Sequence, residues 1–205
     1  FGTDRQADGA VLYRAEAEWM NGGDCMPMEK PAKALSDAQI DYDILPADAL
    51  ENARAENGRM TVNGHSYRFL AVPSAEYLPE RFWRAAARLH REGVPLFFLE
   101  PRRYRVPDFC GALPGETVSV PDLVPTVRKR KLAHDYKARA DFLRISRFRR
   151  GSASCFMLFN ESAVSAFRTE VRLPCAGDYL RLDLLDGVFT RANTRDGAVP
   201  VDLVP

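Results

Sequence analysis

Short apolar runs separated by amphipathic stretches dominate the first half of the chain. Four such runs predict buried strands, at Val11–Tyr13, Tyr42–Leu45, Phe69–Val72 and Val94–Leu99. The first two flank Lys30–Gln39, whose pattern predicts a helix. Because strands and helices alternate at short spacing, we expect a doubly wound parallel sheet flanked by helices.

The connections between these runs carry their own signals. Residues 45–60 are polar and helical in character, and Asn63-Gly64 predicts a hairpin between Met60–Asn63 and Ser66–Arg68. Apolar side chains then recur at helical spacing from Pro79. Gly93 follows the last turn of that predicted helix, a position that favours glycine.

The pattern changes after Pro101, where prolines become frequent. Residues 120–131 predict one short helix, and from Asp141 onward all signals are those of strands. Arg149–Ser152 and Asp186-Gly187 predict hairpin turns between them. Five or six short strands favour an antiparallel β-sandwich that is incomplete. We therefore expect an α/β domain at residues 9–120, a linker with a short helix at 121–140, and a β-sandwich at 141–205.

Composition narrows the function classes. The 205 residues are 46% hydrophobic and 28% charged, and 29 Lys+Arg against 28 Asp+Glu leave a net charge of +1. That balance argues against a nucleic-acid partner. No apolar run approaches the roughly 20 residues that a membrane-spanning helix needs, and the first residues lack a signal-peptide pattern. The four cysteines form no CxxC motif, so we expect reduced thiols, a buried Cys155 and a cytoplasmic location.

Three polar or aromatic residues stand out directly after the first predicted strand. Glu16, Glu18 and Trp19 lie where open α/β sheets usually bind ligands. Carboxylates accept hydrogen bonds from hydroxyl groups and an indole packs on sugar rings, so the cluster is a candidate for sugar contact. The alternative is a set of solvated charges beside an anchoring indole. A glycosidase pair needs roughly 5–10 Å between its carboxyl groups, and nothing in this spacing provides it. We assign no catalytic residue.

Other candidate chemistry is sparse. His65, His90 and His134 are scattered without metal-ligand spacing, and the glycine motifs of nucleotide sites are absent, so we expect no metal and no cofactor. Ser74 follows a predicted strand but lacks the flanking glycines of a nucleophile elbow. A cysteine nucleophile would need Cys25 or Cys110 beside a histidine. The basic run at residues 128–131 fits the end of a helix.

Several segments together resemble a known family. They are LYRAEAEW, MPMEKPAKAL, IDYDILPADAL, VNGHSYRFLAVPSAEYLP and VPLFFLEP, followed by SCFMLFNE and RLPCAGDYLRLDLLDG. Their order, from about residue 9 to 190, resembles the carboxyl-terminal region of large bacterial glycoside hydrolases. In those enzymes a catalytic (β/α)8 barrel precedes a flavodoxin-like domain of the class I glutamine amidotransferase-like type, similar to the trimerisation domain of family 42 β-galactosidases. A β-sandwich follows it.

The resemblance implies a non-catalytic accessory fragment. The barrel and its carboxylates are missing from this sequence, and the amidotransferase nucleophile is absent. Glu16, Glu18, Trp19, Glu76 and Tyr77 would then lie at the substrate side or at an interface. The implied partners are the parent's catalytic barrel, carbohydrate and further copies of the chain. The start without Met fits a piece of a longer protein. Two alternatives stay open: a free-standing small hydrolase using Ser74 or a cysteine, and a carbohydrate-binding module using Trp19 and Trp83.

Overall fold

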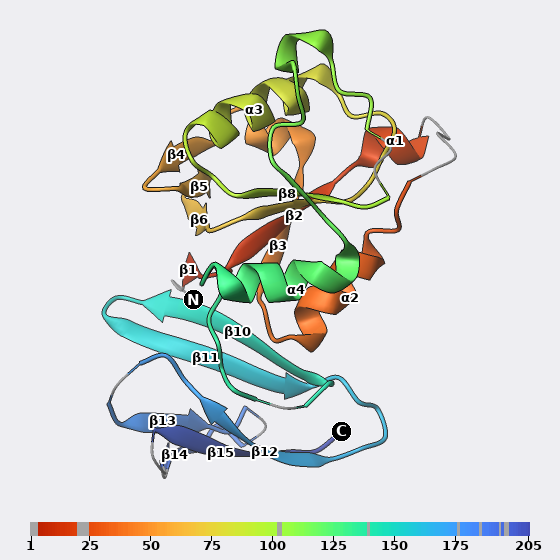
Figure 1. Ribbon diagram of the computed structural model, residues 1–205. Helices are drawn as coiled ribbons and strands as arrows, with labels where there is room; N and C mark the ends of the chain where they lie inside the picture. Colours follow the sequence, from red (N-terminus) through yellow and green to blue (C-terminus); the bar gives the residue numbers. More distant parts are fainter. Residues whose placement is uncertain are drawn as a thin grey trace.

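The computed structural model describes residues 4–19, 25–101, 104–138, 140–175, 177–184, 186–192, 194 and 197–205. A five-stranded sheet forms the centre of the first domain (Figure 1). Its strands are β2 (Gly9–Tyr13), β3 (Tyr42–Pro46), β7 (Leu70–Val72), β8 (Leu96–Leu99) and β9 (Glu116–Val118). They run parallel in the order β3-β2-β7-β8-β9. In chain order this is 2-1-3-4-5, the order of flavodoxin-like doubly wound sheets.

Helices cover both faces of this sheet. The helix α3 (Glu80–Arg91) and the turn η1 (Ala47–Leu50) lie on one face, while α2 (Glu29–Asp37) and α4 (Val120–Lys129) lie on the other (Figure 1). The pleat of β2 explains the division, since Ala10 and Leu12 pack toward α3 and Val11 packs toward α2 and α4. The predicted α/β domain, including its two-sided core, is therefore confirmed.

Two short elements extend the edges of this domain. The helix α1 (Ala15–Trp19) follows β2, and the turn η2 (Asp108–Cys110) lies between β8 and β9. The strand β9 was not anticipated, because its three residues lie in a proline-rich stretch. It exists through its pairing with β8, which joins Phe97 to Glu116 and Leu99 to Val118.

A small antiparallel sheet packs beside α3. It contains β4 (Arg54–Glu56), β5 (Arg59–Val62) and β6 (His65–Tyr67), and the hairpin predicted at Asn63-Gly64 joins the last two. The expected helical character of residues 45–60 was wrong beyond η1. Asn57 and Gly58 have φ values of 52° and 71°, so a second Asn-Gly turn folds β4 back onto β5.

The second half of the chain is rich in β-strands, which form three separate small sheets. β1 (Asp4–Arg5) joins β10 (Leu143–Arg150) and β11 (Ala153–Asn160). β12 (Phe167–Arg172) pairs with β15 (Ala198–Leu203), and β13 (Tyr179–Leu182) pairs with β14 (Phe189–Ala192). Leu143, Ile145 and Val171 form a core between β10 and β12. We refer to residues 140–205 as the β-rich region.

The structure of this region differs from the sequence-based expectations in two details. Cys155 is exposed rather than buried, because it alternates along β11 with Ser154 and Phe156, whose side chains lie on the more buried face. The first strand also crosses the expected domain boundary, since Asp4 and Arg5 pair with Arg149 and Phe148 of β10. The amino-terminal segment thus contributes to the β-rich region although it precedes the α/β domain in the chain.

Candidate functional site

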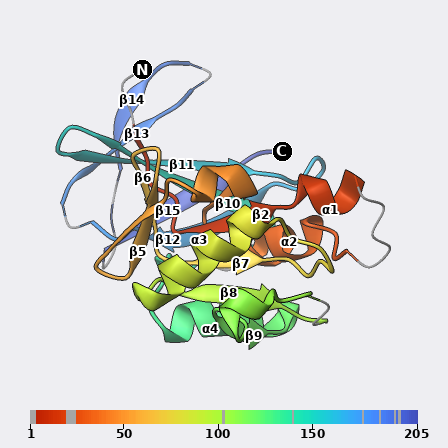
Figure 2. The same cartoon turned by 90° about the horizontal axis from the view of Figure 1, so that it is seen from above.

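The strand order locates a candidate site at one edge of the parallel sheet. From β2 the chain crosses to β3 on one side, and from β3 it returns to β7 on the other side of β2. Ligands of open α/β sheets bind beside such a reversal, at the carboxyl ends of the strands. Here α1 follows β2 and residues 73–79 follow β7. In Figure 2, α1 and the segments that follow β7 and β8 lie at the same side of the molecule.

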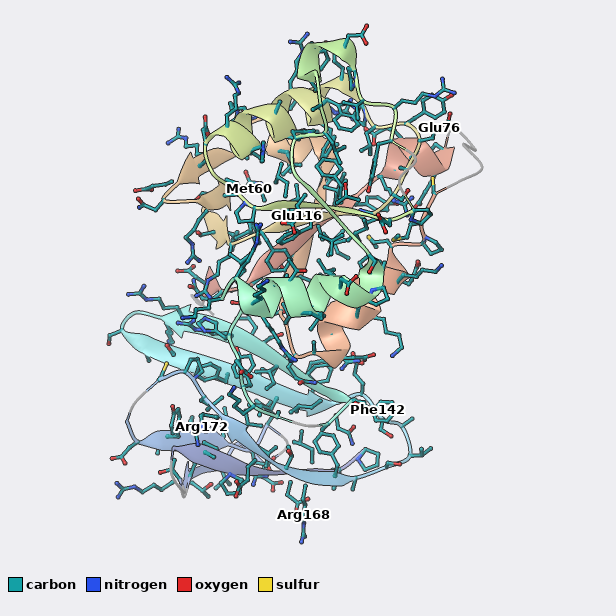
Figure 3. The ribbon with its side chains drawn as sticks, in the orientation of Figure 1. Met60, Glu76, Glu116, Phe142, Arg168 and Arg172 are labelled. Atoms are coloured by element: carbon teal, nitrogen blue, oxygen red, sulfur yellow. The ribbon has the colours of Figure 1, made fainter. Side chains whose placement is uncertain are left out.

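The five residues expected at this edge are brought to it. Glu16, Glu18 and Trp19 are carried by α1, while Glu76 and Tyr77 lie in the segment between β7 and α3. Figure 3 shows Glu76 beside α1. Because β2 and β7 are paired parallel neighbours, both groups lie at the same end of the sheet. We call this set of five residues the rim.

The carboxylate of Glu16 is held by an arginine of α3. It accepts a hydrogen bond from Nη2 of Arg81 and forms an ion pair with it. Nε of Arg81 also lies 3.6 Å from a carboxylate oxygen of Glu51, so the guanidinium bridges α1 to the residue after η1. Glu16 therefore fixes α1 against the domain.

Arg14, the last residue before α1, was missed by the sequence reasoning. Its side chain is 1% exposed, and Nη1 lies 3.8 Å from the carboxylate of Glu18. Within the described part of the chain, none of its three guanidinium nitrogens makes a hydrogen bond. The sequence did contain a signal for this residue, because Arg14 is a charged residue directly after the apolar run Val11–Tyr13. The buried cation thus lies beside the carboxylate of Glu18 at the start of the edge.

The two tryptophans have opposite environments. The side chain of Trp19 is 80% exposed at the end of α1. Trp83 is buried under α3 and stacks on Phe98, with 5.9 Å between ring centroids. Trp83 is thus a core residue, as its helical spacing indicated, and cannot serve as a sugar platform. Trp19 presents the large apolar surface of the rim.

The second half of the rim is also organised by an arginine. Nη2 of Arg105 lies 2.5 Å from the carboxylate of Glu76, and its guanidinium carbon lies 4.7 Å from the ring centroid of Tyr77. The backbone N–H of Arg105 donates to the carbonyl of Glu76 at 2.9 Å. Nearby, the hydroxyl of Tyr104 donates to the carbonyl of Val72 at 2.7 Å, and burial raises the pKa of this phenol. Arg105 and Tyr104 carried no recognisable sequence signal.

Two of the candidate nucleophiles, Ser74 and Cys110, lie in environments that do not activate them. The buried hydroxyl of Ser74 donates to the backbone carbonyl of Pro101, which cannot act as a base. Burial raises the pKa of the Cys110 thiol, which disfavours the reactive thiolate. The three histidines lie on different elements, and the described residues contain no group of three or more metal-ligating side chains.

Each of the three carboxylates of the rim lies beside an arginine. Glu16 accepts a hydrogen bond from Arg81, Glu76 is paired with Arg105, and Glu18 lies 3.8 Å from Arg14. Exposed aromatic surface lies on the same edge at Trp19. No helix in the described ranges has the length and apolar character that crossing a bilayer requires.

Comparisons with known proteins extend this picture. No protein-family model matches the chain, and no curated protein matches it. Among solved structures, the apo exo-carrageenase GH42 from Bacteroides ovatus is similar with a TM-score of 0.58 and 10% identity over 96% of this chain. Gan42B, a GH42 β-galactosidase, is similar with a TM-score of 0.58 and 11% identity over 97% of this chain.

The likeness concerns only part of each of those enzymes. This chain corresponds to 28% of the length of the exo-carrageenase and 39% of the length of Gan42B. The chain therefore has the fold of a segment of larger glycoside hydrolases, and at this level of identity the comparison establishes the fold alone.

Proposed function

We propose that this chain is a non-catalytic accessory part of a protein related to glycoside hydrolases, in which it supports domain packing and assembly. The α/β domain corresponds, in this proposal, to the flavodoxin-like, glutamine amidotransferase-like domain of such enzymes, and the β-rich region to the following β-sandwich. Support comes from the strand order of the sheet and from similarity over almost the whole chain to segments of two larger enzymes.

The rim is the surface through which the chain would act. The main observation in support is the exposure of Trp19. Its side chain is 80% exposed at the point where the strand order of the sheet reverses. An aromatic side chain that is this exposed gains free energy when another surface covers it. The arginine-held carboxylates of Glu16 and Glu76 beside it supply fixed hydrogen-bond acceptors. We propose that the rim borders the sugar site of the parent's catalytic barrel or a contact with a further copy of the chain.

The alternative of a free-standing hydrolase finds no support in the geometry. It would need Ser74 or a cysteine activated by a base, whereas the Ser74 hydroxyl is bonded to a backbone carbonyl. A carbohydrate-binding module would need exposed aromatic side chains. Trp83 is buried and cannot contact a sugar, so only Trp19 of the two tryptophans is accessible for this role.

Tryptophan fluorescence tests this assignment. The emission of Trp19, obtained as the difference between the chain and its Trp19→Phe variant, is recorded while the chain is concentrated and while a barrel from the same reading frame is added. The proposal expects a blue shift in at least one titration, with a matching rise in mass by light scattering. Leu180→Ala, which removes an exposed apolar side chain far from the rim, should leave both responses unchanged. An emission that stays unshifted in both titrations would refute the role of the rim.

A further inference from the structure

A hollow lies where the α/β domain meets the β-rich region. It has a volume of about 290 Å³, with one wall from the end of α2 and from β3 and the other from β10 and β11. A second hollow of about 460 Å³ shares Ser36, Arg144 and Glu161 with it. We call the two together the junction groove. Figure 3 shows Phe142, which lines the second hollow, beside the start of β10 below α2. The first volume lies just below the usual range for ligand pockets, roughly 300–1,000 Å³, and the second lies within it.

The charges in the groove are already paired. Arg5 lies 2.6 Å from a carboxylate oxygen of Asp41 and 2.7 Å from one of Asp43. Arg144 lies 3.1 Å from Asp37 and 2.5 Å from Glu161. Among the described residues around the groove, five acidic side chains outnumber three basic ones: Asp37, Asp41, Asp43, Asp141 and Glu161 against Arg5, Lys33 and Arg144. A phosphate, sulfate or carboxylate ligand would meet fixed carboxylates here, so the lining favours a neutral ligand.

The polar groups that a ligand can reach in the groove are the partly exposed carboxylates of its lining. The side chains of Asp37 and Glu161 are 33% and 44% exposed although both face Arg144, so each carboxylate can accept a further hydrogen bond from a ligand. A ligand hydroxyl both donates and accepts, so it can serve an acceptor and a donor in the same small space.

Apolar surface lies next to these polar groups. Phe159 is 39% exposed and sits opposite Arg144 in the pairing of β10 and β11, so both side chains project from the same face. Phe142, at the other end of the groove, is 52% exposed. The hydroxyl groups of Tyr42 and Ser36 lie 3.4 Å apart on the opposite wall. Hydroxyl-binding groups facing an exposed aromatic ring match a pyranose, which has hydroxyl groups at its rim and a C–H face.

We infer that the junction groove binds a neutral sugar of one or two rings. The site is separate from the rim and does not depend on the proposed function. Its walls come from both halves of the molecule, so an occupied groove would hold the α/β domain and the β-rich region together. A sugar bound here would stabilise the arrangement of the two parts by mass action.

Nuclear magnetic resonance of the isotope-labelled chain tests the site. Lactose and galactose are the neutral probes, with galacturonate and inorganic phosphate as charged comparators. We expect shifts concentrated at residues 41–44 and 143–146 with the neutral sugars and none with the charged probes. Phe159→Ala should weaken binding by about 3- to 10-fold. Tyr42→Phe and Glu161→Gln change single polar groups and keep the test decisive if Phe159→Ala does not fold. Phe189→Ala, at an exposed phenylalanine of β14 that lines neither hollow, is the matched control and should bind as the unmodified chain does.

The outcomes separate this inference from the role of the rim. Absence of shifts at tens of millimolar of either neutral sugar would overturn the inference. Binding that survives Phe159→Ala and Glu161→Gln but is lost in Trp19→Ala would place the sugar at the rim, which supports the proposed function and refutes the junction groove. Tighter binding of galacturonate or phosphate than of lactose would refute the neutral ligand.

Discussion

Nη1 of Arg147 lies 2.5 Å from Nε2 of His134, which ties the linker after α4 to strand β10. A guanidinium only donates, so this ring nitrogen accepts and the imidazole is neutral. The backbone N–H of His134 donates to Asp8 at 3.1 Å, and Arg68 lies 3.3 Å from the same ring nitrogen. One histidine thereby connects both halves of the molecule through a buried polar cluster.

The two titratable members of this cluster respond to pH in opposite directions. Burial raises the pKa of Asp8 to about 6 from an ordinary value of 3.8. Burial, together with the neighbouring Arg68, Arg147 and Arg59, lowers the pKa of His134 to about 4 from 6.5. Asp8 therefore stabilises the fold below pH 4 and loses that contribution as the pH rises through 6. His134 stabilises it above pH 6.5 and loses that contribution as the pH falls toward 4.

Asp8→Asn removes the titration of Asp8, which opposes that of His134. The pH dependence of this cluster then comes from His134 alone. We expect the free energy of unfolding of this variant to fall as the pH is lowered from 6.5 to 4, more steeply than that of the unmodified chain. Urea unfolding followed by circular dichroism at half-unit pH steps measures the slope. An equal slope in both proteins would contradict the raised pKa of Asp8.

His134→Gln is the reciprocal change. The Gln side-chain oxygen can still accept from Arg147, so the titration of Asp8 remains. The free energy of unfolding should then decrease as the pH rises from 4 to 6, by an amount on the order of 2 kcal/mol. His90→Gln, on the exposed last turn of α3, is the control and should follow the unmodified chain. A variant that gains stability over this pH range would show the assignment to be wrong.

The two tryptophans should differ sharply on truncation. Trp83→Ala removes a fully buried ring that stacks on Phe98, at a cost of about 3–5 kcal/mol. Trp19→Ala removes an exposed ring and should change stability by no more than about 0.5 kcal/mol. Thermal unfolding of both variants measures the difference. A large loss of stability in Trp19→Ala would mean that this indole is an anchor of the isolated chain rather than a free recognition surface.

Gln39 is expected to couple the two halves of the molecule. Its buried Nε2 donates to the carbonyl of Ala140 at 3.1 Å and to that of Asp37 at 2.7 Å. Gln39→Ala leaves these carbonyls unsatisfied, so stability should fall by about 1–3 kcal/mol. Calorimetry should show the β-rich region unfolding before the α/β domain. Glu29→Ala, at the exposed start of α2, is the control, and an identical melting curve for Gln39→Ala would rule out the coupling.

Ser74 should be inert toward a fluorophosphonate probe. Its buried hydroxyl donates to the carbonyl of Pro101, and a backbone carbonyl does not take up a proton at neutral pH. The intact protein mass should stay unchanged after incubation with the probe. Labelling that disappears in Ser74→Ala would revive a free-standing hydrolase.

The parallel sheet and its helices were predictable because burial on both sides produces continuous apolar runs such as Val94–Leu99. The strand β9 and the turn at Asn57-Gly58 were not anticipated, since three-residue strands depend on a neighbouring strand rather than on their own pattern. Because Glu16 follows β2 and Glu76 follows β7, their positions in the chain were enough to place both at the same edge of the parallel sheet. Their ion-pair partners Arg81 and Arg105 could not be predicted from the sequence, because ion pairs between distant segments leave no periodic pattern.

The junction groove was equally invisible in the sequence. Arg5 and Asp41 are separated by more than thirty positions, and they meet because β1, which pairs with β10, lies beside the start of β3. Phe159 and Arg144 become neighbours through the register of β10 and β11. Contacts of this kind follow from tertiary structure and not from local preference.

The reading frame that contains this chain tests the central claim most directly. If the chain is an accessory part of a larger protein related to glycoside hydrolases, the frame continues upstream into a segment long enough for a (β/α)8 barrel, with glutamates at strand ends. A start codon immediately before Phe1 together with a stop codon after Pro205 would contradict that account.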